Sequence, residues 1–207
     1  MIAIEVSGPK AYFPKPGIHG LEKGYECITP SAARGILESF YWNSNIQYVI
    51  DEIRVLEPIR FASDAVKEPG KVVNLKVLKN VRYLILAHYF LNGVKDENEG
   101  SVKTMAILKK RIMKKKPFKT PCLGYRKYTC NYRWISEEQL DDANLQGISV
   151  NKDFDMMPYD VMYDTKNRAK CPVWYRPHME KGVINLRNLT VMKNGEELVV
   201  NRVHPEE

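Results

Sequence analysis

The sequence has no pair of cysteines spaced as in a zinc ribbon or a redox motif. Its four cysteines form no Cys-x-x-Cys pair; they are Cys27, Cys122, Cys130 and Cys171. No signal peptide is recognisable ahead of the first strand-like residues, so a disulfide framework is not expected either. The simplest interpretation is that these are reduced thiols in a cytoplasmic protein.

Long apolar runs and the signatures of several enzyme classes are also missing. The apolar stretch at residues 81–91 is interrupted by Arg82 and His88 and is shorter than a bilayer span, so no membrane is expected. There is no phosphate-binding loop, no serine-hydrolase elbow and no His-Glu-x-x-His motif. A calcium-loop-like start near residue 151 has Met156 and Met162 where Gly and Glu are required. The sequence therefore predicts neither a metal nor a cofactor.

Acidic residues are absent from residues 100–136, whereas basic residues are abundant there. This segment carries eleven Lys and Arg side chains, while the whole chain of 207 residues has a net charge of only +7. The remainder of the chain is therefore net acidic, and the segregated charge creates a local field that attracts a polyanion. The alternative is a solvated helix face.

Aromatic residues follow the lysines and favour the first interpretation. They are Tyr125, Tyr128, Tyr132 and Trp134, and they are interleaved with Arg126, Lys127 and Arg133. Cations hold phosphates and aromatic rings stack on unpaired bases, so this mixture fits single-stranded RNA better than duplex DNA.

Hydrophobic periodicity predicts alternating strands and helices in the first two thirds of the chain. Strands are expected at residues 2–6, 46–56, 77–91 and 125–134, with a hairpin tip or loop at residues 64–76. A first helix is expected from the N-cap Thr29, and it places one apolar face inward: Ala33, Ile36, Leu37 and Phe40. A second helix is expected over residues 101–116, ended by Pro117, with these side chains inward: Val102, Met105, Ala106 and Ile112.

This order of elements predicts an α+β fold of the ferredoxin-like (RRM-like) type, which many RNA-binding domains share. After Ser136 an acidic linker leads into short strands separated by turns at residues 180–182 and 193–195. We therefore expect a first domain at residues 1–135, and a linker with a small antiparallel β-sheet domain at residues 136–207.

Residues 29–42, Thr-Pro-Ser-Ala-Ala-Arg-Gly-Ile-Leu-Glu-Ser-Phe-Tyr-Trp, resemble the first-helix motif of the CRISPR-associated protein 5 family in its subtype I-C (Dvulg) form. Further resemblances run in order along the chain: Phe13-Pro-Lys-Pro16, the segment 50–59, Ala87-His-Tyr89, Pro121-Cys-Leu-Gly-Tyr-Arg126 and Met179-Glu-Lys-Gly-Val-Ile184.

The resemblance implies a repeat-associated (RAMP) ferredoxin-like domain with a small C-terminal β domain. It also implies metal-independent cleavage of precursor CRISPR RNA, by attack of the RNA's own 2′-hydroxyl, to leave a 2′,3′-cyclic phosphate. The protein would then stay on the 5′ handle as a subunit of the Cascade surveillance complex, beside the backbone subunit of family 7 and the large subunit of family 8.

The family's catalytic residues carry over only in part. Its tyrosine at the end of the first helix matches Tyr41, which would orient the 2′-hydroxyl; the alternative is an aromatic side chain that only packs. Its Lys-His pair is replaced by Ser101 and Val102. The nearest substitutes are Lys103 for the cation and His88 for the histidine, although His88 also fits a structural role in its strand.

Arg34 of the matching motif is a predicted RNA contact, and its alternative is a salt bridge with Glu38. The other predicted RNA-binding residues are Lys109, Lys110, Arg111, Lys114, Lys115, Lys116, Arg126 and Lys127. Two hypotheses remain open: a subunit that cleaves the repeat, and an inactive subunit that caps the 5′ handle. A basic structural protein of the ribosomal type would explain the lysines but not the family motif.

Overall fold

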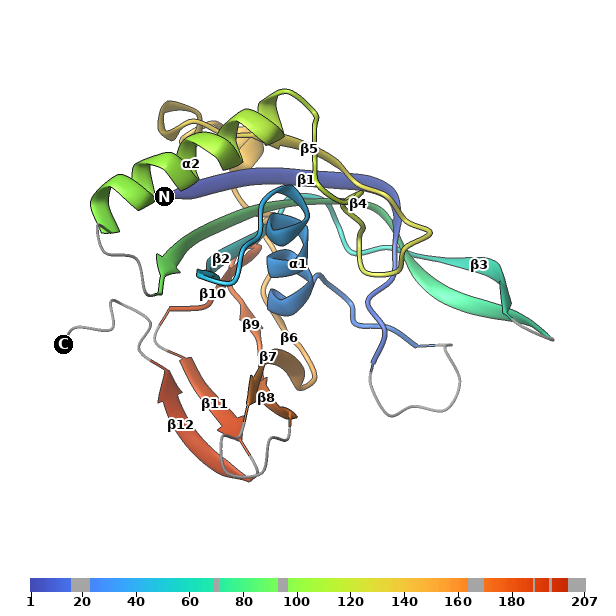
Figure 1. Cartoon of the computed structure of the whole chain (residues 1–207). Coiled ribbons are helices and arrows are strands. Elements are labelled where there is room, and N and C mark those ends of the chain that lie inside the picture. The colour runs from blue at the N-terminus through green and yellow to red at the C-terminus, as the bar shows by residue number, and fades with distance from the viewer. Residues whose placement is uncertain are drawn as a thin grey trace.

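The computed structural model describes residues 1–15, 23–68, 71–92, 97–163, 170–187, 189–193 and 195–200. In these residues it combines two α-helices with antiparallel sheets (Figure 1). The helices are α1 (Pro30–Phe40) and α2 (Glu97–Met113). Neither helix has the length and apolar character needed to cross a membrane.

The larger sheet carries both helices. Its strand order is β10-β2-β4-β1-β5, and β3 pairs with the far end of β4. The strands are β1 (Ile2–Ala11), β2 (Ile46–Val55), β3 (Phe61–Glu68), β4 (Lys71–Leu91), β5 (Asn131–Trp134) and β10 (Val183–Asn185). Helix α1 connects β1 to β2, and α2 connects β4 to β5, while the β3–β4 hairpin projects away from the rest of the molecule (Figure 1).

Helix α1 forms as its sequence predicts. The hydroxyl of Thr29 accepts a hydrogen bond from the Ala32 N–H at 3.2 Å. Pro30 occupies the first turn, where a backbone N–H would have no acceptor within the helix, so the missing N–H of proline costs no hydrogen bond. The predicted inward face is buried in full: Ala33, Ile36, Leu37 and Phe40. Burial of this stripe against the sheet holds α1 in place.

Residues 83–87 of strand β4 are buried on both faces of the sheet. Tyr83 and Ile85 belong to the core beneath the helices, whereas Leu84 and Leu86 pack on the opposite face with Ile135. Because successive side chains along a strand point to opposite faces of the sheet, His88 and Tyr89 also lie on opposite faces. Tyr89 lies on the helix face with Ser101, and His88 lies on the other.

Helix α2 begins four residues earlier and ends three residues earlier than the predicted helix at residues 101–116, and it is rotated. Its buried residues are Thr104, Leu108 and Ile112, spaced four apart, and Met105 is partly buried. Val102 is 72% exposed and Ala106 is exposed, so the inward placement of these two was wrong. The physical reason is that this helix packs at the edge of the sheet, where one buried side chain per turn makes the contact and the other faces stay in solvent.

The predicted strand at residues 125–134 was wrong in its first half. Only β5 is extended, and the preceding residues fold into a loop held against β1 by hydrogen bonds between Tyr12 and its neighbours Leu123 and Tyr125. Gly124 makes this possible: its φ is +83°, and a Cβ there would lie 2.1 Å from the Tyr12 carbonyl oxygen.

The C-terminal part forms the expected small antiparallel sheet, with strand order β12-β11-β8-β7. Its strands are β7 (Met157–Tyr163), β8 (Lys170–Tyr175), β11 (Leu189–Lys193) and β12 (Glu196–Val200). Two short strands pair beside it, β6 (Lys152–Asp153) and β9 (His178–Met179). The acidic linker forms two 3-10 turns, Glu137–Gln139 and Ala143–Leu145. Because β10 pairs with β2, this part of the chain also contributes one strand to the larger sheet.

Candidate nucleic-acid interface

Tyr41 lies at the C-terminal end of α1, where the chain turns from helical to extended backbone. Its carbonyl oxygen accepts a hydrogen bond from the hydroxyl of Tyr48 at 2.8 Å, and its own hydroxyl accepts one from the Asn43 amide at 3.3 Å. Burial raises the pKa of Tyr48, so this tyrosine remains a protonated donor. Tyr41 is only partly buried, which leaves it accessible at the helix end.

Arg111 reaches Tyr41 from the last turn of α2. Its guanidinium lies 5.3 Å from the centre of the Tyr41 ring, and it donates a hydrogen bond to the Phe40 carbonyl at 2.8 Å. The cation therefore sits on the aromatic face while also satisfying a carbonyl at the end of α1. The fold thus joins a predicted catalytic residue and a predicted RNA-binding residue.

Ser101 lies on the helix face of the sheet, in contact with Tyr89, and Val102 beside it is exposed. The hydroxyl of Tyr89 donates to the Ser101 carbonyl at 2.7 Å, and the Tyr89 ring meets the Tyr48 ring edge-on with centroids 6.1 Å apart. Lys103, two residues after Ser101 in α2, is exposed. It lies eight residues before Arg111, about 12 Å along the helix axis. Arg111, and not Lys103, is therefore the cation in contact with Tyr41.

His88 is not brought together with Tyr41. It lies on the sheet face opposite the helices, where its Nδ1 is 2.8 Å from Asp51 Oδ1 and 2.9 Å from Oδ2. The Phe90 ring meets it edge-on at 4.9 Å. Alternation of side chains along β4 puts Tyr89 and His88 on opposite faces, which sequence spacing alone did not resolve. The placement of His88 agrees with its structural alternative.

Arg34 is engaged inside the protein. Its guanidinium lies 2.5 Å from the buried Asp160 carboxylate on β7 and 3.4 Å from Glu38, one turn along α1. The salt bridge with Glu38 was the alternative that the sequence offered, and it is confirmed. Arg34 therefore ties α1 to the C-terminal sheet.

The C-terminal end of α2 forms a basic hollow of about 590 Å³. It is lined by Ile107, Lys110, Arg111, Lys114, Lys116, Pro117 and Phe118. Its three lysines form no ion pair with any acidic residue in the described part of the chain. Uncompensated cations around a hollow are suited to phosphate groups.

The remaining cations predicted to bind RNA differ in how many contacts they make within the protein. Lys115 lies over the Tyr132 ring and donates to its carbonyl, and Lys109 lies 5.7 Å from the centre of the Trp134 ring. Arg126 is exposed.

Lys127 lies 2.9 Å from the Asp64 carboxylate, which also accepts hydrogen bonds from Lys10 at 2.8 Å and from Tyr128 at 2.6 Å. These donors hold the pKa of Asp64 well below its usual range. Lys127 therefore shares one carboxylate with Lys10, so its positive charge is only partly compensated within the fold.

The tyrosines that were expected to stack on bases pack in or against the hydrophobic core instead. Tyr128 is 6% exposed, and Tyr125 and Tyr132 pack against buried residues. The exposed aromatic side chains near the basic hollow are Trp42, 57% exposed, and Phe118, 69% exposed. Sequence reasoning missed both, although the position of Phe118 between lysines was an available signal.

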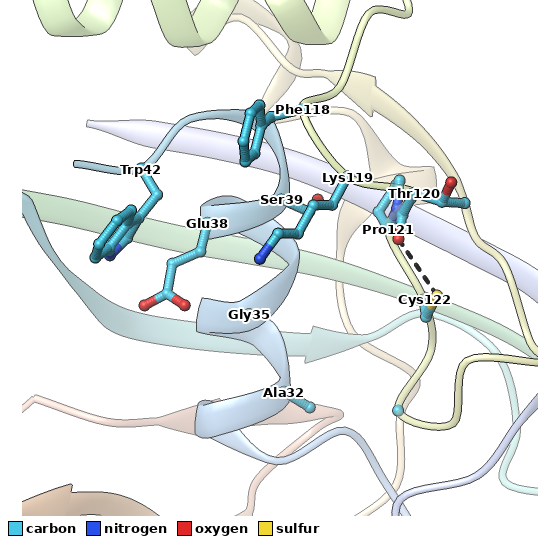
Figure 2. Close-up of a pocket in the computed structure, with 11 residues that line it drawn as sticks. Ala32, Gly35, Glu38, Ser39, Trp42, Phe118, Lys119, Thr120, Pro121 and Cys122 are labelled. Atoms are coloured by element: carbon cyan, nitrogen blue, oxygen red, sulfur yellow. Dashed lines mark hydrogen bonds between the residues drawn. The ribbon is translucent and has the colours of Figure 1, made fainter.

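Trp42 and Phe118 flank a groove of about 440 Å³ between α1 and residues 118–124 (Figure 2). The N–H groups of Phe118 and Lys119 both donate to the Ser39 carbonyl, at 2.8 and 2.9 Å, and so fix this segment to the helix. Further along, the Cys122 thiol donates to the Thr120 carbonyl at 3.3 Å. An exposed aromatic groove therefore adjoins Tyr41 and the basic hollow.

The model of a CRISPR-associated protein family (Cas_Cas5) in its Cas5d form matches residues 1–187. The chain belongs to the Cas5 family, in the I-C subtype. It is 29% identical to the CRISPR pre-crRNA endoribonuclease Cas5d of Mannheimia succiniciproducens, over 89% of this chain and 94% of that protein. It is 26% identical to the protein of the same name from Thermus thermophilus, over 78% of this chain and 73% of that one.

Solved structures agree with this family assignment at the level of the fold. A crystal structure of a CRISPR-associated protein superposes with a TM-score of 0.72 at 23% identity, covering 90% of this chain and 91% of that one. The resemblance recognised in the first-helix motif of this Cas5 chain is therefore confirmed.

Proposed function

We propose that this Cas5 protein binds CRISPR RNA and cleaves its precursor, the activity for which its curated relatives are named. One observation carries the proposal: Tyr41, the family's tyrosine, is in contact with Arg111 at the edge of a basic hollow. A phenol, a fixed guanidinium and uncompensated lysines form a site where RNA phosphate is bound and its charge stabilised.

The proposed reaction is attack of an RNA 2′-oxygen on the adjacent phosphorus. The bond from phosphorus to the 5′-oxygen breaks, giving a 2′,3′-cyclic phosphate and a 5′-hydroxyl, while the 2′-hydroxyl loses its proton and the leaving oxygen gains one. Tyr41 would orient the 2′-hydroxyl. Arg111 would stabilise the charge on the pentacoordinate phosphate. The sequence had suggested Lys103 for this role.

We further propose that residues 1–135 form a ferredoxin-like RAMP domain, and that residues 136–207 form a linker and a small C-terminal β domain, with β10 added to the larger sheet. The strand order β5-β1-β4-β2, with α1 and α2 as the connections, supports this. We also propose that the protein acts in the cytoplasm, within a Cascade complex beside subunits of families 7 and 8.

A second candidate function is capping of the 5′ handle without cleavage. It is favoured by Ser101 and Val102, which stand where the family resemblance leads one to expect Lys and His. The described residues offer no replacement histidine at Tyr41, since His88 lies on the other face and His178 pairs with Asp153 at 2.7 Å. Loss of proton transfer by a histidine costs about a hundredfold or more in rate.

One experiment separates the two functions: incubation of the purified protein with its own repeat RNA in excess EDTA. Cleavage by the wild type at one position, lost in Tyr41→Phe and Arg111→Lys but kept in Lys10→Ala, supports the nuclease. Tight binding without any cut supports capping. A gain of cleavage in the double variant Ser101→Lys, Val102→His would show that the rest of the site is intact.

A further inference from the structure

The groove between α1 and residues 118–124 has walls suited to a flat ring. Trp42 and Phe118 reach it from different segments of the chain and are both largely exposed. Gly35 lies along its floor, and a Cβ added there would meet nothing within 4 Å. Figure 2 shows Trp42, Glu38 and Lys119 around the same opening. Aromatic side chains beside an open floor provide a surface on which an unpaired base stacks.

Glu38 gives this groove a recognition group within an otherwise basic surface. Among the residues that line the groove it is the acidic one. Its side chain is 39% exposed, so one side of the carboxylate faces the opening while Arg34 lies 3.4 Å from the other. Burial, and to a smaller extent the charge of Asp160, raise the pKa of Glu38, whereas Arg34 and Lys119 lower it. The carboxylate is thus held in place by cations without being covered.

A carboxylate accepts two parallel N–H bonds, and the common bases differ in what they offer it. Guanine presents two adjacent donors, N1–H and the N2 amino group, on its Watson–Crick edge. Adenine and cytosine present one amino group beside an acceptor nitrogen, which the carboxylate repels. Uracil presents one donor between two carbonyl oxygens. Only guanine satisfies both carboxylate oxygens at once.

We propose that this groove binds one unpaired guanine of the RNA, stacked on Trp42 or Phe118, with its Watson–Crick edge on the Glu38 carboxylate. Lys119 then contacts a neighbouring phosphate. The inference rests on the proposed function for RNA binding, but it does not require cleavage.

Affinity of the full-length protein for short RNAs tests the proposal. Four fluorescently labelled five-nucleotide strands are compared, with G, A, C or U at the centre and uridine elsewhere, and 2′-fluoro sugars at every position so that no 2′-oxygen can attack. By anisotropy, the guanine strand should bind the wild type about tenfold more tightly than the others, the scale of one bidentate base contact. In Glu38→Gln the preference should fall to about threefold or less. The control Glu137→Gln removes an exposed acid elsewhere and should keep the full preference.

The stacking residues have their own matched control. Whichever of Trp42→Ala and Phe118→Ala removes the ring on which the base stacks should weaken binding of all four strands about fivefold or more, since stacking does not depend on base identity. Phe61→Ala removes another exposed phenylalanine beneath a lysine, with Lys76 4.0 Å from the ring centre, on β3. It should leave the affinity for all four strands unchanged.

Equal affinity of the wild type for the four strands, or a guanine preference that persists in Glu38→Gln, would overturn the proposal. Cleavage in EDTA is scored separately. A wild type that prefers guanine but never cuts supports this site and refutes only the nuclease. A wild type that cuts but has no base preference refutes only this site.

Discussion

The guanidinium of Arg111 lies over the ring of Tyr41 and donates to the carbonyl of Phe40, so one side chain of α2 holds the C-terminal end of α1. The two helices are far apart in sequence, and this contact places a fixed positive charge beside the family's tyrosine. An arginine satisfies both demands because its planar fork stacks and donates at the same time.

Replacement of Arg111 should therefore affect both stability and activity. Arg111→Ala removes a cation–π contact and a hydrogen bond to a carbonyl, and we expect a loss of about 1–3 kcal/mol in the free energy of unfolding, measured in urea. Arg111→Lys should restore part of the stability but still lower the cleavage rate about a hundredfold. Lys110→Ala is the control; if it slows cleavage as much, general charge and not Arg111 is responsible.

The lysines of the basic hollow should dominate the salt dependence of RNA binding. The triple variant Lys110→Ala, Lys114→Ala, Lys116→Ala should reduce the slope of log affinity against log salt by about 2, because each phosphate contact to a single strand contributes about 0.7. Arg133→Gln should change the slope little, since Glu5 already lies 2.6 Å from that guanidinium. An unchanged slope in the triple variant would place the RNA elsewhere.

Asp64 should stabilise the fold in a pH-dependent way. Its pKa is lowered by hydrogen bonds from Lys10, Tyr128 and Lys127, so its stabilisation is complete above the unfolded-state pKa of about 4 and is lost as the pH falls through the lower folded-state pKa. Asp64→Asn should cost about 2 kcal/mol at pH 7. The gap between variant and wild type should narrow in urea titrations below about pH 4. Asp141→Asn, on an exposed turn, should show no gap at either pH.

Gly124 should tolerate no side chain. A Cβ would overlap the Tyr12 carbonyl, and the positive φ is itself unfavourable for other residues. We expect Gly124→Ala to lower the free energy of unfolding by about 2 kcal/mol or more, and to detach the loop that carries residues 118–124. Gly35→Ala is the control, because that site has open space and a helix favours alanine. In thermal melts, Gly124→Ala should lower the melting temperature and Gly35→Ala should raise it.

Several elements could be predicted because their signals are local. Thr29 and Pro30 mark the start of α1, and the spacing of its apolar residues identifies the buried face, since capping and periodicity depend on neighbours in sequence. The first-helix motif likewise identified the family. By contrast, β5 was predicted too long, because the close approach of Gly124 to Tyr12 joins segments far apart in the chain.

The sequence by itself determined the family, the order of helices and strands, and the concentration of positive charge in residues 100–136. Only the tertiary structure decided which of those charges are available. Lys127 shares the Asp64 carboxylate with Lys10, and Arg133 shares the Glu5 carboxylate with Arg82. Arg111 is held on Tyr41, while the lysines of the basic hollow meet no described acid. The physical reason is that ion pairs, stacking and the face of a strand depend on distances across the fold. A linear pattern of charges and rings does not contain those distances.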